Sequence, residues 1–541
     1  RPPSSTLSPS SAASDVYKRQ LFYNARFYTL SDPPLAEAMA VCGGRVLAVG
    51  ALDELKGIAG RGWERIDLGG RVALPGLHDA HLHLLGYGLS LERVDLSGAG
   101  SLEECLRLVA ERGKTVPPGR WVLGRGWNYN AWAEGRLPTR WDLDRVLPDR
   151  PALLSSKDGH LVWANSLAIK LAGIPEDAPD PEGGHIVRDE RGRMTGVFQE
   201  RAAEPLWRAV PEPDLEERVR ALLRAQGKLL EMGITCVHTM EGRECFEALQ
   251  ELRRRGELKL RVVIYLPQSS IDHLAALGLR SGFGDDLLRI GGVKLFADGA
   301  LGGQTAALFE PYIGMGDYRG ILVQEPEELE EAVRRAAEAG LSVAIHAIGD
   351  RAVSVALDAI ELASSRIEAN HLRPRIEHVQ LIRPEDMERM ARLKVIASMQ
   401  PSHAVSDRPV AERYWGERCR WAYAWRSLLE AGVVLAFGSD APAEPPDPFL
   451  GLCAAVTRRD ERGEPPGGWH PEQRLTVEEA IRAYTCWAAM AGGTATGGLE
   501  PGRWADFALL PDDPFTAPPE RLKEIKPEAV YIAGERVWPE P

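Results

Sequence analysis

The segment that decides the fold reads Leu74-Pro75-Gly76-Leu77-His78-Asp79-Ala80-His81-Leu82-His83. An apolar lead-in ends in Pro-Gly, and two histidines then stand one residue apart. In an extended strand the side chains alternate between faces, so Asp79, His81 and His83 share one side. The two imidazoles then lie within about 7 Å of each other, close enough to bind one metal ion. Two surface or core histidines would explain a lone His-x-His pair equally well, so the metal interpretation depends on further ligands downstream.

Seven more strand-like runs follow this segment, and helical patterns separate them. The runs are 233–238, 260–265, 292–299, 341–346, 375–379, 395–400 and 433–440. Continuous apolar strands that alternate with amphipathic helices, such as 326–339 and 384–393, indicate a parallel sheet that is buried on both faces. Eight such units predict an α/β fold with a closed (β/α)8 barrel of the TIM type, whose active site lies at the carboxyl ends of the strands.

The two ends of the chain share a β-like pattern with Pro-rich and Gly-Gly turns. The short strand-like pieces are 21–25, 45–50, 505–510 and 529–534. Because chain termini often lie close together, we expect one small β-sandwich built from 21–72 and 491–541, beside a barrel domain over 73–490. Residues 1–20 are rich in Ser, Pro and Ala and lack the apolar stretch of a secretory signal. We expect them to be a disordered or non-native leader.

An insertion of roughly residues 100–212 separates the first two barrel strands. It is dense in tryptophan, with Trp121, Trp127, Trp132, Trp141 and Trp163. Loops over the mouth of a barrel shape the substrate pocket, so the insertion is a candidate lid or specificity element. A decorative subdomain with its own tryptophan core is the alternative interpretation.

Composition and charge narrow the possible partners. The 541-residue chain carries a formal net charge of -13, which argues against a nucleic-acid partner. Its seven cysteines are scattered without a Cys-x-x-Cys spacing, which suits free thiols in a reducing cytoplasm. No apolar run approaches the roughly 18 residues of a membrane span. We therefore expect a cytoplasmic protein that acts on a small molecule and has no membrane partner.

Six potential metal ligands lie at or near the carboxyl ends of the strand-like runs. They are His81, His83, Lys294, His346, His378 and Asp440. Imidazoles and carboxylates suit Zn, Mn, Fe or Ni, and no thiolate is required. Because the carboxyl ends of barrel strands meet at one mouth, we expect these side chains to converge. By strand alternation Glu377 should point away from His378, so it is left out of the set.

Lysine is the unusual member of this set. Lys294 is flanked by Val293, Leu295 and Phe296, and partial desolvation would lower the pKa of its amine. A neutral amine can add carbon dioxide to form a carbamate, which could bridge two metal ions. Taken alone, Lys294 reads as an interior or rim lysine; among four histidines and an aspartate at strand ends, the bridging role is favoured.

Several segments together resemble the amidohydrolase superfamily, and within it the YtcJ-like metal-dependent hydrolases that include N-substituted formamide deformylases. The segments that carry the resemblance are 74–83, 293–308, 344–352, 375–378, 438–449 and 499–507. The resemblance covers nearly the whole chain after the leader. Relatives often carry arginine where this chain has Gln304, which puts the substrate preference at that position in doubt.

The resemblance implies a centre of two divalent ions, with zinc as the first candidate. His81 and His83 would bind one ion, His346 and His378 the other, and carbamylated Lys294 would bridge the two. Asp440 would contact the first ion and accept a proton from the bridging water. A homodimer would be unsurprising for the family.

The sequence also offers candidate substrate-binding and supporting residues. His238 ends the second strand and Gln400 follows the seventh, and hydrogen-bonded rim residues are the alternative for both. The predicted substrate-binding residues are Trp127, Asn128, His160, His238, Gln304 and Gln400. Asp79 is expected to orient a metal-bound imidazole.

The predicted reaction is hydrolysis of a carbon–nitrogen bond, other than a peptide bond, in a small amide. Two cations lower the pKa of a shared water, hydroxide attacks the polarised carbonyl, and Asp440 carries the proton to the leaving nitrogen. A deaminase or an esterase could use the same centre, because a fold does not determine a function. A catalytically silent binding barrel is the third alternative; loss of a ligand would mark it, and all six ligands are present.

Overall fold

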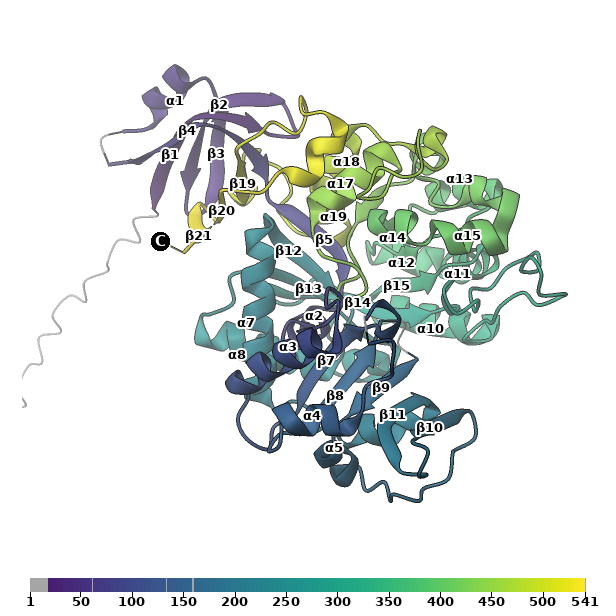
Figure 1. Ribbon diagram of the computed structural model, residues 1–541. Coiled ribbons are helices and arrows are strands. Elements are labelled where there is room, and N and C mark those ends of the chain that lie inside the picture. Colours follow the sequence, from purple (N-terminus) through teal and green to yellow (C-terminus); the bar gives the residue numbers. More distant parts are fainter. Residues whose placement is uncertain (1–17, 61, 133, 158–159, 541) are drawn as a thin grey trace, which may run out of the picture. The chain divides into compact units, whose positions relative to one another are not determined.

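The computed structural model describes residues 18–60, 62–132, 134–157 and 160–540 (Figure 1). They form two compact units, one comprising the described residues up to Tyr87 and from Leu222 onward, the other Gly88–Ala221. Most of the predicted leader lies outside the described residues. Its boundary was set too late, because β1 (Arg19–Tyr28) already includes Gln20. The buried Gln20 amide donates a hydrogen bond to the Gly534 carbonyl at 3.0 Å, which ties it to the other end of the chain.

The first unit contains a barrel of eight parallel strands, as the sequence predicted. In order around the sheet they are β5 (Leu77–Leu82), β12 (Ile234–Thr239), β13 (Arg261–Pro267), β14 (Leu288–Phe296), β15 (Ser342–Ala347), β16 (Arg375–His378), β17 (Ile396–Met399) and β18 (Leu435–Phe437). Every neighbouring pair along this order is parallel. The strands are almost entirely buried, and helices alternate with them along the chain. Both features confirm the (β/α)8 architecture.

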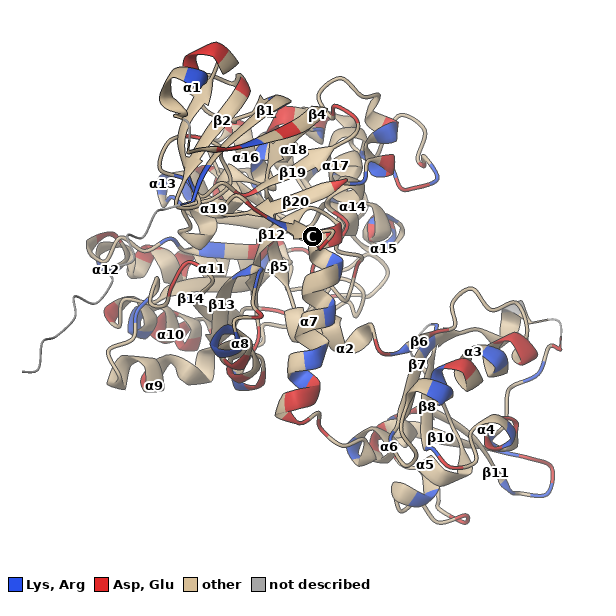
Figure 2. Cartoon of the chain, turned by 90° about the vertical axis from the view of Figure 1, so that its left-hand side faces the viewer, with Lys and Arg blue, Asp and Glu red and all other residues tan. Residues whose placement is uncertain are grey.

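Helices separate successive barrel strands along the chain. The principal ones are α7 (Leu215–Glu231), α8 (Arg243–Arg255), α10 (Pro326–Glu338), α11 (Asp350–Leu362), α13 (Pro384–Arg392), α16 (Trp425–Glu430) and α17 (Pro448–Thr457). Figure 2 shows acidic and basic residues mixed along α7 and α10. On α10, for example, Arg334 pairs with Glu331 and Glu338, one turn away on either side. Helix α10 thus turns charges to water and an apolar stripe to the core, whereas α17 has no charged residue and is mostly buried.

The barrel closes where the end of β18 meets β5. The Asp440 N–H donates to the His81 carbonyl at 2.7 Å, which joins the two ends of the strand order. Gly438 lies at this contact, and a Cβ there would collide with the His81 nitrogen and a carboxylate oxygen of Asp79. Glycine is therefore required for the backbones to approach this closely.

Both ends of the chain contribute to one small β domain. Its seven strands, in spatial order, are β21 (Glu535–Trp538), β20 (Ala529–Ile532), β19 (Phe507–Leu510), β4 (Glu64–Pro75), β1 (Arg19–Tyr28), β2 (Leu35–Cys42) and β3 (Arg45–Gly50). They belong to a single hydrogen-bonded sheet. The core of this domain includes Phe507 stacked on Tyr531 at 4.5 Å, with Phe22 edge-on to both. β4 leads through Gly76 directly into β5, so this domain sets where the His-x-His strand begins.

A buried ion pair joins the β domain to the barrel. Arg261, the first residue of β13, donates from Nε and Nη2 to the carboxylate of Asp506 at 2.5 and 2.9 Å. Both side chains are almost fully buried, and the Asp506 carboxylate also accepts the Ala533 N–H at 2.8 Å. Two hydrogen bonds in a fixed fork satisfy charges that water cannot reach.

The insertion unit, Gly88–Ala221, has its own six-stranded sheet. Its strands, in spatial order, are β10 (Gly184–Arg188), β11 (Met194–Glu200), β9 (Leu161–Ala164), β8 (Ala152–Ser156), β7 (Val122–Trp127) and β6 (Val94–Asp95). Helices α3 (Leu102–Thr115) and α4 (Arg140–Val146) lie within the same unit. The predicted insertion, 100–212, is therefore slightly shorter than the observed unit.

Three tryptophans of the insertion belong to the core of that unit, whereas Trp141 is exposed. Trp127, Trp132 and Trp163 pack together with ring centroids 6.0 to 6.5 Å apart. Trp127 is fully buried and its indole N–H donates to the Leu154 carbonyl, so the prediction that its ring binds substrate is wrong. The amphipathic ring serves as core because the sheet supplies a partner for its polar edge.

Two other predicted pocket residues of the insertion have local partners. The Asn128 carboxamide oxygen accepts the Asn130 N–H at 3.2 Å and caps a short 3-10 turn. His160 is exposed and pairs with Glu200 at 2.7 Å. Their roles toward a substrate stay predictions.

In the described part of the chain, none of the helices is both long and apolar enough to cross a membrane.

We expect Asp506→Asn to destabilise the protein by about 3 kcal/mol, because it leaves the Arg261 guanidinium buried without a counter-charge. The thermal unfolding midpoint should fall by several degrees. Asp53→Asn is the matched control, because it removes an exposed Asp53–Lys56 pair. Equal midpoints for the two variants would contradict a structural role for the Arg261–Asp506 pair.

Candidate metal centre

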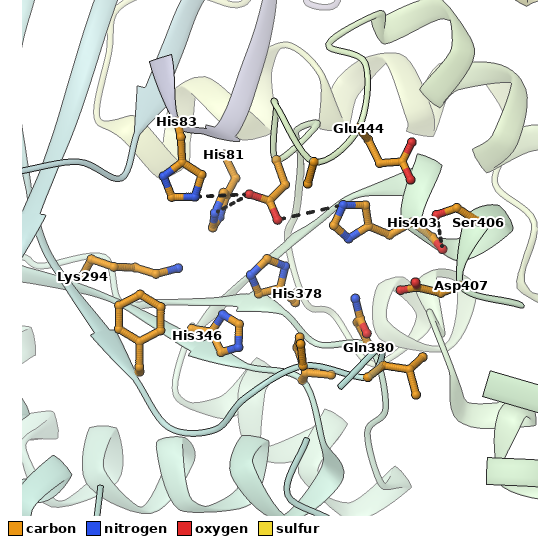
Figure 3. Close-up of a pocket in the computed structure, with 17 residues that line it drawn as sticks. His81, His83, Lys294, His346, His378, Gln380, His403, Ser406, Asp407 and Glu444 are labelled. Atoms are coloured by element: carbon orange, nitrogen blue, oxygen red, sulfur yellow. Dashed lines mark hydrogen bonds and ion pairs between the residues drawn. The ribbon is translucent and has the colours of Figure 1, made fainter. Parts of the chain in front are cut away.

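The six predicted ligands come together at the carboxyl end of the barrel. Lys294 and His346 lie in β14 and β15, His378 ends β16, His81 lies in β5, and the rest follow their strands closely. All six line one cavity of about 370 Å³ (Figure 3). In this view the amine end of Lys294 points toward the imidazoles. Residues far apart in sequence thus share one site because the barrel gathers its strand ends.

The Asp440 carboxylate lies among the imidazoles. One of its oxygens is 3.5 Å from His81 Nε2 and 3.4 Å from His83 Nε2, and the other is 3.9 Å from His403 Nε2. Ligand atoms of His81, His378 and Asp440 all lie within 4.8 Å of one another. The His346 and His378 rings are 4.6 Å apart. Such a cluster of nitrogen and oxygen donors fits a divalent metal ion.

Each imidazole has one ring nitrogen occupied by an oxygen acceptor of the protein. The pairs are His81 Nδ1 with Glu377 at 2.5 Å, His83 Nδ1 with the Met240 carbonyl at 3.1 Å, His346 Nε2 with the Gly299 carbonyl at 2.8 Å, and His378 Nδ1 with Gln400 at 2.8 Å. In the neutral rings of His81, His346 and His378, the nitrogen held by this acceptor carries the proton, so the other nitrogen keeps its lone pair. This arrangement is the one found around metal-binding histidines, whose second nitrogen is fixed by an outer acceptor.

The electrostatics favour the neutral form of three of these imidazoles. For His83 burial opposes protonation, but the hydrogen bond with Asp440 and the charge of that carboxylate raise its pKa above the ordinary value. Burial lowers the pKa of His81 to about 4 and that of His346 to about 3. Burial also holds the pKa of His378 well below its ordinary value. For Asp440 burial opposes ionisation, but the hydrogen bond from His83 and the nearby histidines hold its pKa well below the usual range. Neutral imidazoles and an ionised carboxylate are the forms that bind metal.

Lys294 is a buried amine without a partner. Its side chain is 4% exposed, and in the described part of the chain Nζ forms no hydrogen bond. Burial lowers the pKa of this amine to about 8. Because a buried charge without a partner is costly, the lysine fits a site where the amine is neutral or modified.

Glu377 is the supporting residue that sequence reasoning missed. Glu377 points toward the barrel interior, where it reaches His81 on a different strand. Arg375 lies on the same face and donates to Glu377 at 2.5 Å. Burial opposes ionisation of Glu377, but Arg375 and His81 hold its pKa well below the ordinary value. The signal was an Arg-x-Glu pair, two residues apart and therefore on one face of the strand.

Asp79 does not orient an imidazole, contrary to the prediction. Its carboxylate accepts the backbone N–H groups of His81 at 3.1 Å and Ser439 at 3.0 Å, and the Ser439 hydroxyl. Burial raises the pKa of Asp79 to about 7. Its role is to hold β5 against the segment that presents Asp440.

Two of the ligands have unusual backbone conformations. His378 has φ of 80° and Asp440 has φ of 60°, in the left-handed region that non-glycine residues rarely adopt. Each such residue costs about 1–3 kcal/mol. The turn takes His378 out of strand alternation, so its ring faces the cavity although the strand ends there.

Three predicted substrate-binding residues do not line the cavity. His238 is fully buried inside the barrel and faces Arg375 at 2.9 Å. Gln304 donates to the carbonyl of Gly302, two residues earlier. Gln400 is buried and holds His378. His238 and Gln400 are fully buried, so the prediction that they contact substrate is wrong, because alternation fixes a face but does not fix a depth. The role of Gln304 toward a substrate stays a prediction.

A second group of donors, His78, Cys236 and His238, lies inside the barrel. The Arg375 guanidinium donates to His238 Nδ1, so in the neutral ring Nε2 carries the proton. A protonated nitrogen has no lone pair for a metal. Burial also raises the pKa of the Cys236 thiol to about 12. We therefore interpret these three side chains as part of the barrel core and not as a metal site.

The barrel and its ring of histidines, lysine and aspartate define a metal-dependent hydrolase of the amidohydrolase type. The chain belongs to the amidohydrolase family, whose model matches residues 64–538. It is thus a hydrolase of carbon–nitrogen bonds, which confirms the predicted enzyme class.

Two curated relatives and one solved structure match over nearly the full chain. The protein named "Putative amidohydrolase YtcJ" of Bacillus subtilis (strain 168) is 34% identical, over 96% of this chain and 99% of that protein. The N-substituted formamide deformylase of Arthrobacter pascens is 31% identical, over 92% and 94%. The structure of an uncharacterized metal-dependent hydrolase from Pyrococcus horikoshii OT3 is 34% identical, with a TM-score of 0.78, over 93% and 99%. The resemblance stated from the motifs is confirmed.

We expect Gln400→Leu to weaken metal binding about tenfold or more, because His378 loses the acceptor that fixes its ring. Titration with zinc against a competing chelator measures this affinity. Gln304→Asn is the matched control, since that side chain bonds the Gly302 carbonyl and none of the imidazoles, and asparagine tolerates its φ of 51°. Unchanged zinc affinity in Gln400→Leu would show that the Gln400 contact does not support a metal ligand.

Proposed function

We propose that this protein is a metal-dependent amidohydrolase that cleaves the C–N bond of a small organic amide. The observation that carries the proposal is the set of four imidazoles, each with one ring nitrogen anchored on a protein acceptor, gathered around Asp440 and around Lys294, whose amine forms no hydrogen bond with a described residue. The full-length similarity to an N-substituted formamide deformylase supports an amide substrate. The complete donor set argues against a catalytically silent barrel.

The residues fit two divalent ions, with zinc favoured and Mn, Fe or Ni possible for the same donors. His81, His83 and Asp440 would hold one ion, and His346 and His378 the other. Lys294, as its carbamate, would bridge them, because a neutral buried amine can take up carbon dioxide. The bound ions would supply Lewis acidity, which lowers the pKa of a water and polarises a carbonyl.

The chain's own residues would manage the proton and the charge. Asp440 is ionised and held by His83, so it can accept a proton from the attacking water. The same carboxylate then returns that proton to the leaving nitrogen, which would otherwise depart as a poor amide anion. Glu377 and Gln400 keep His81 and His378 in the tautomers that face the cavity.

We extend the proposal to the setting of the enzyme. All seven cysteines are free thiols, which suits the reducing cytoplasm expected from the sequence. A small-molecule substrate and a homodimer remain parts of this proposal. Size-exclusion chromatography with light scattering would test the dimer.

The direct test is turnover by the metal-reconstituted protein on a panel of N-substituted formamides, other N-acyl amines, N-acyl amino acids and aryl esters. We expect amine release from amides, and a chelator should abolish it. Release of product from esters alone would favour the esterase alternative. Absence of turnover on the whole panel would favour the silent barrel.

Asp440→Asn should lower kcat by at least about a thousandfold, since the amide cannot shuttle a proton. It should keep much of the bound metal, because the four imidazoles remain. Metal analysis and steady-state kinetics on the best amide measure the two effects separately. Turnover like that of the unaltered enzyme would exclude the proton-shuttle role.

A further inference from the structure

His83 is the least buried of the four imidazoles at the metal centre. Its side chain is 38% exposed, and the other three are no more than 13% exposed. A ring with few packed neighbours needs hydrogen bonds to hold its orientation. His83 directly precedes α2 (Leu84–Ser90), and the chain passes into the insertion unit shortly afterwards, at Gly88. Its restraints come from the end of the neighbouring strand, β12.

Met240, the first residue after β12, contacts both the backbone and the ring at the end of β5. Its N–H donates to the Leu82 carbonyl at 3.1 Å, and its carbonyl accepts a hydrogen bond from His83 Nδ1, also at 3.1 Å. The other ring nitrogen of His83 is 3.4 Å from the Asp440 carboxylate, on the cavity side (Figure 3). The ring is thus held between a backbone carbonyl and the centre of the site.

Glu241 and Thr239 hold the three residues that follow His83. The Glu241 carboxylate accepts the N–H groups of Leu85 and Gly86, both at 2.9 Å. It also accepts the Thr239 hydroxyl at 2.8 Å, and the oxygen of that hydroxyl accepts the Leu84 N–H at 3.1 Å. These are the first N–H groups of α2, which have no partner inside the helix.

We propose that Glu241 is a positioning residue of the metal centre, which orients His83 toward the ion that His83 shares with His81 and Asp440. The inference rests on the proposed function, because the metal centre is part of it. The alternative is an ordinary helix cap that contributes to stability alone. The contacts favour positioning, because the four consecutive residues that begin with His83 bond to the three that end with Glu241.

The Glu241 contacts require a carboxylate. All three groups that bond to it are donors, and an ionised carboxylate only accepts, so both of its oxygens are used. A carboxamide of the same size would keep one acceptor oxygen and would turn its NH2 group toward a donor. Glu241→Gln therefore breaks part of this arrangement without leaving a cavity.

Zinc titration against a competing chelator, in bicarbonate buffer, tests the inference. We expect Glu241→Gln to weaken one of the two ions about tenfold or more, the effect of losing a supporting contact, and to leave the other unchanged. Glu257→Gln is the matched control, because that carboxylate is exposed in the turn before β13. Unchanged affinities in Glu241→Gln, or an equal loss for both ions, would overturn the inference.

The cobalt-loaded protein shows whether Glu241 acts through His83. The visible absorption of Co(II) depends on the ligands of the ion, so His83→Ala defines the change that loss of this imidazole causes. The spectrum of Glu241→Gln should shift toward that of His83→Ala, whereas Glu257→Gln should match the unaltered protein. A Glu241→Gln spectrum identical to that of the unaltered protein would support the ordinary helix cap, even if thermal unfolding showed a less stable variant.

Neither measurement requires turnover, so the inference and the proposed reaction can fail separately. Zinc binding without hydrolysis of any amide would overturn the reaction, and the Glu241→Gln affinities would still decide the inference. Normal hydrolysis with unchanged zinc affinities in Glu241→Gln would overturn the inference alone. If the unaltered protein bound no zinc, both would fail.

Discussion

The closure between β18 and β5 is the constraint on which the rest of the structure depends. Gly438 lets the two backbones meet, the Asp440 N–H bonds the His81 carbonyl, and Asp79 bonds the backbone of both segments. This contact brings a carboxylate to the two histidines of β5. Without it, Asp440 and the His-x-His pair would lie at opposite edges of an open sheet. The fold and the chemistry thus share one contact, and a single methyl group at Gly438 would disturb both.

A buried polar network inside the barrel orients His81, one of the candidate metal ligands. Arg375 donates to Glu377, and Glu377 in turn pairs with His81. Burying such charges costs several kcal/mol per ion unless each is hydrogen-bonded, and here they are. What the network provides is a defined tautomer: His81 presents one lone pair and cannot rotate away. The left-handed backbone conformation of His378 is strained, and it turns the imidazole of His378 toward the cavity. The strain and the buried charges lower the free energy of unfolding, and in return the metal-binding side chains are already oriented before any ligand binds.

The sequence predicted the barrel well because most of the barrel strands are mainly apolar, and several of them are followed closely by a polar side chain. The same pattern pointed to His346 and Asp440, although nothing in the chain order brings them together. It could not predict Glu377, because alternation says which face a residue occupies and a closed barrel decides which strand it meets. The prediction for Trp127 failed for a different reason. A dense group of tryptophans is compatible with either a pocket wall or a core, and here Trp127 packs into the core of the insertion unit.

The central claim is that residues from different barrel strands cage metal at one mouth. Its most direct test is a crystal structure of the zinc- and bicarbonate-treated protein, with data collected at the zinc absorption edge. The account predicts anomalous peaks about 2.0–2.2 Å from ring nitrogens of His81, His83, His346 and His378, with carbamate density on Lys294 between them. Zinc bound elsewhere on the chain, with these imidazoles uncoordinated, would contradict it.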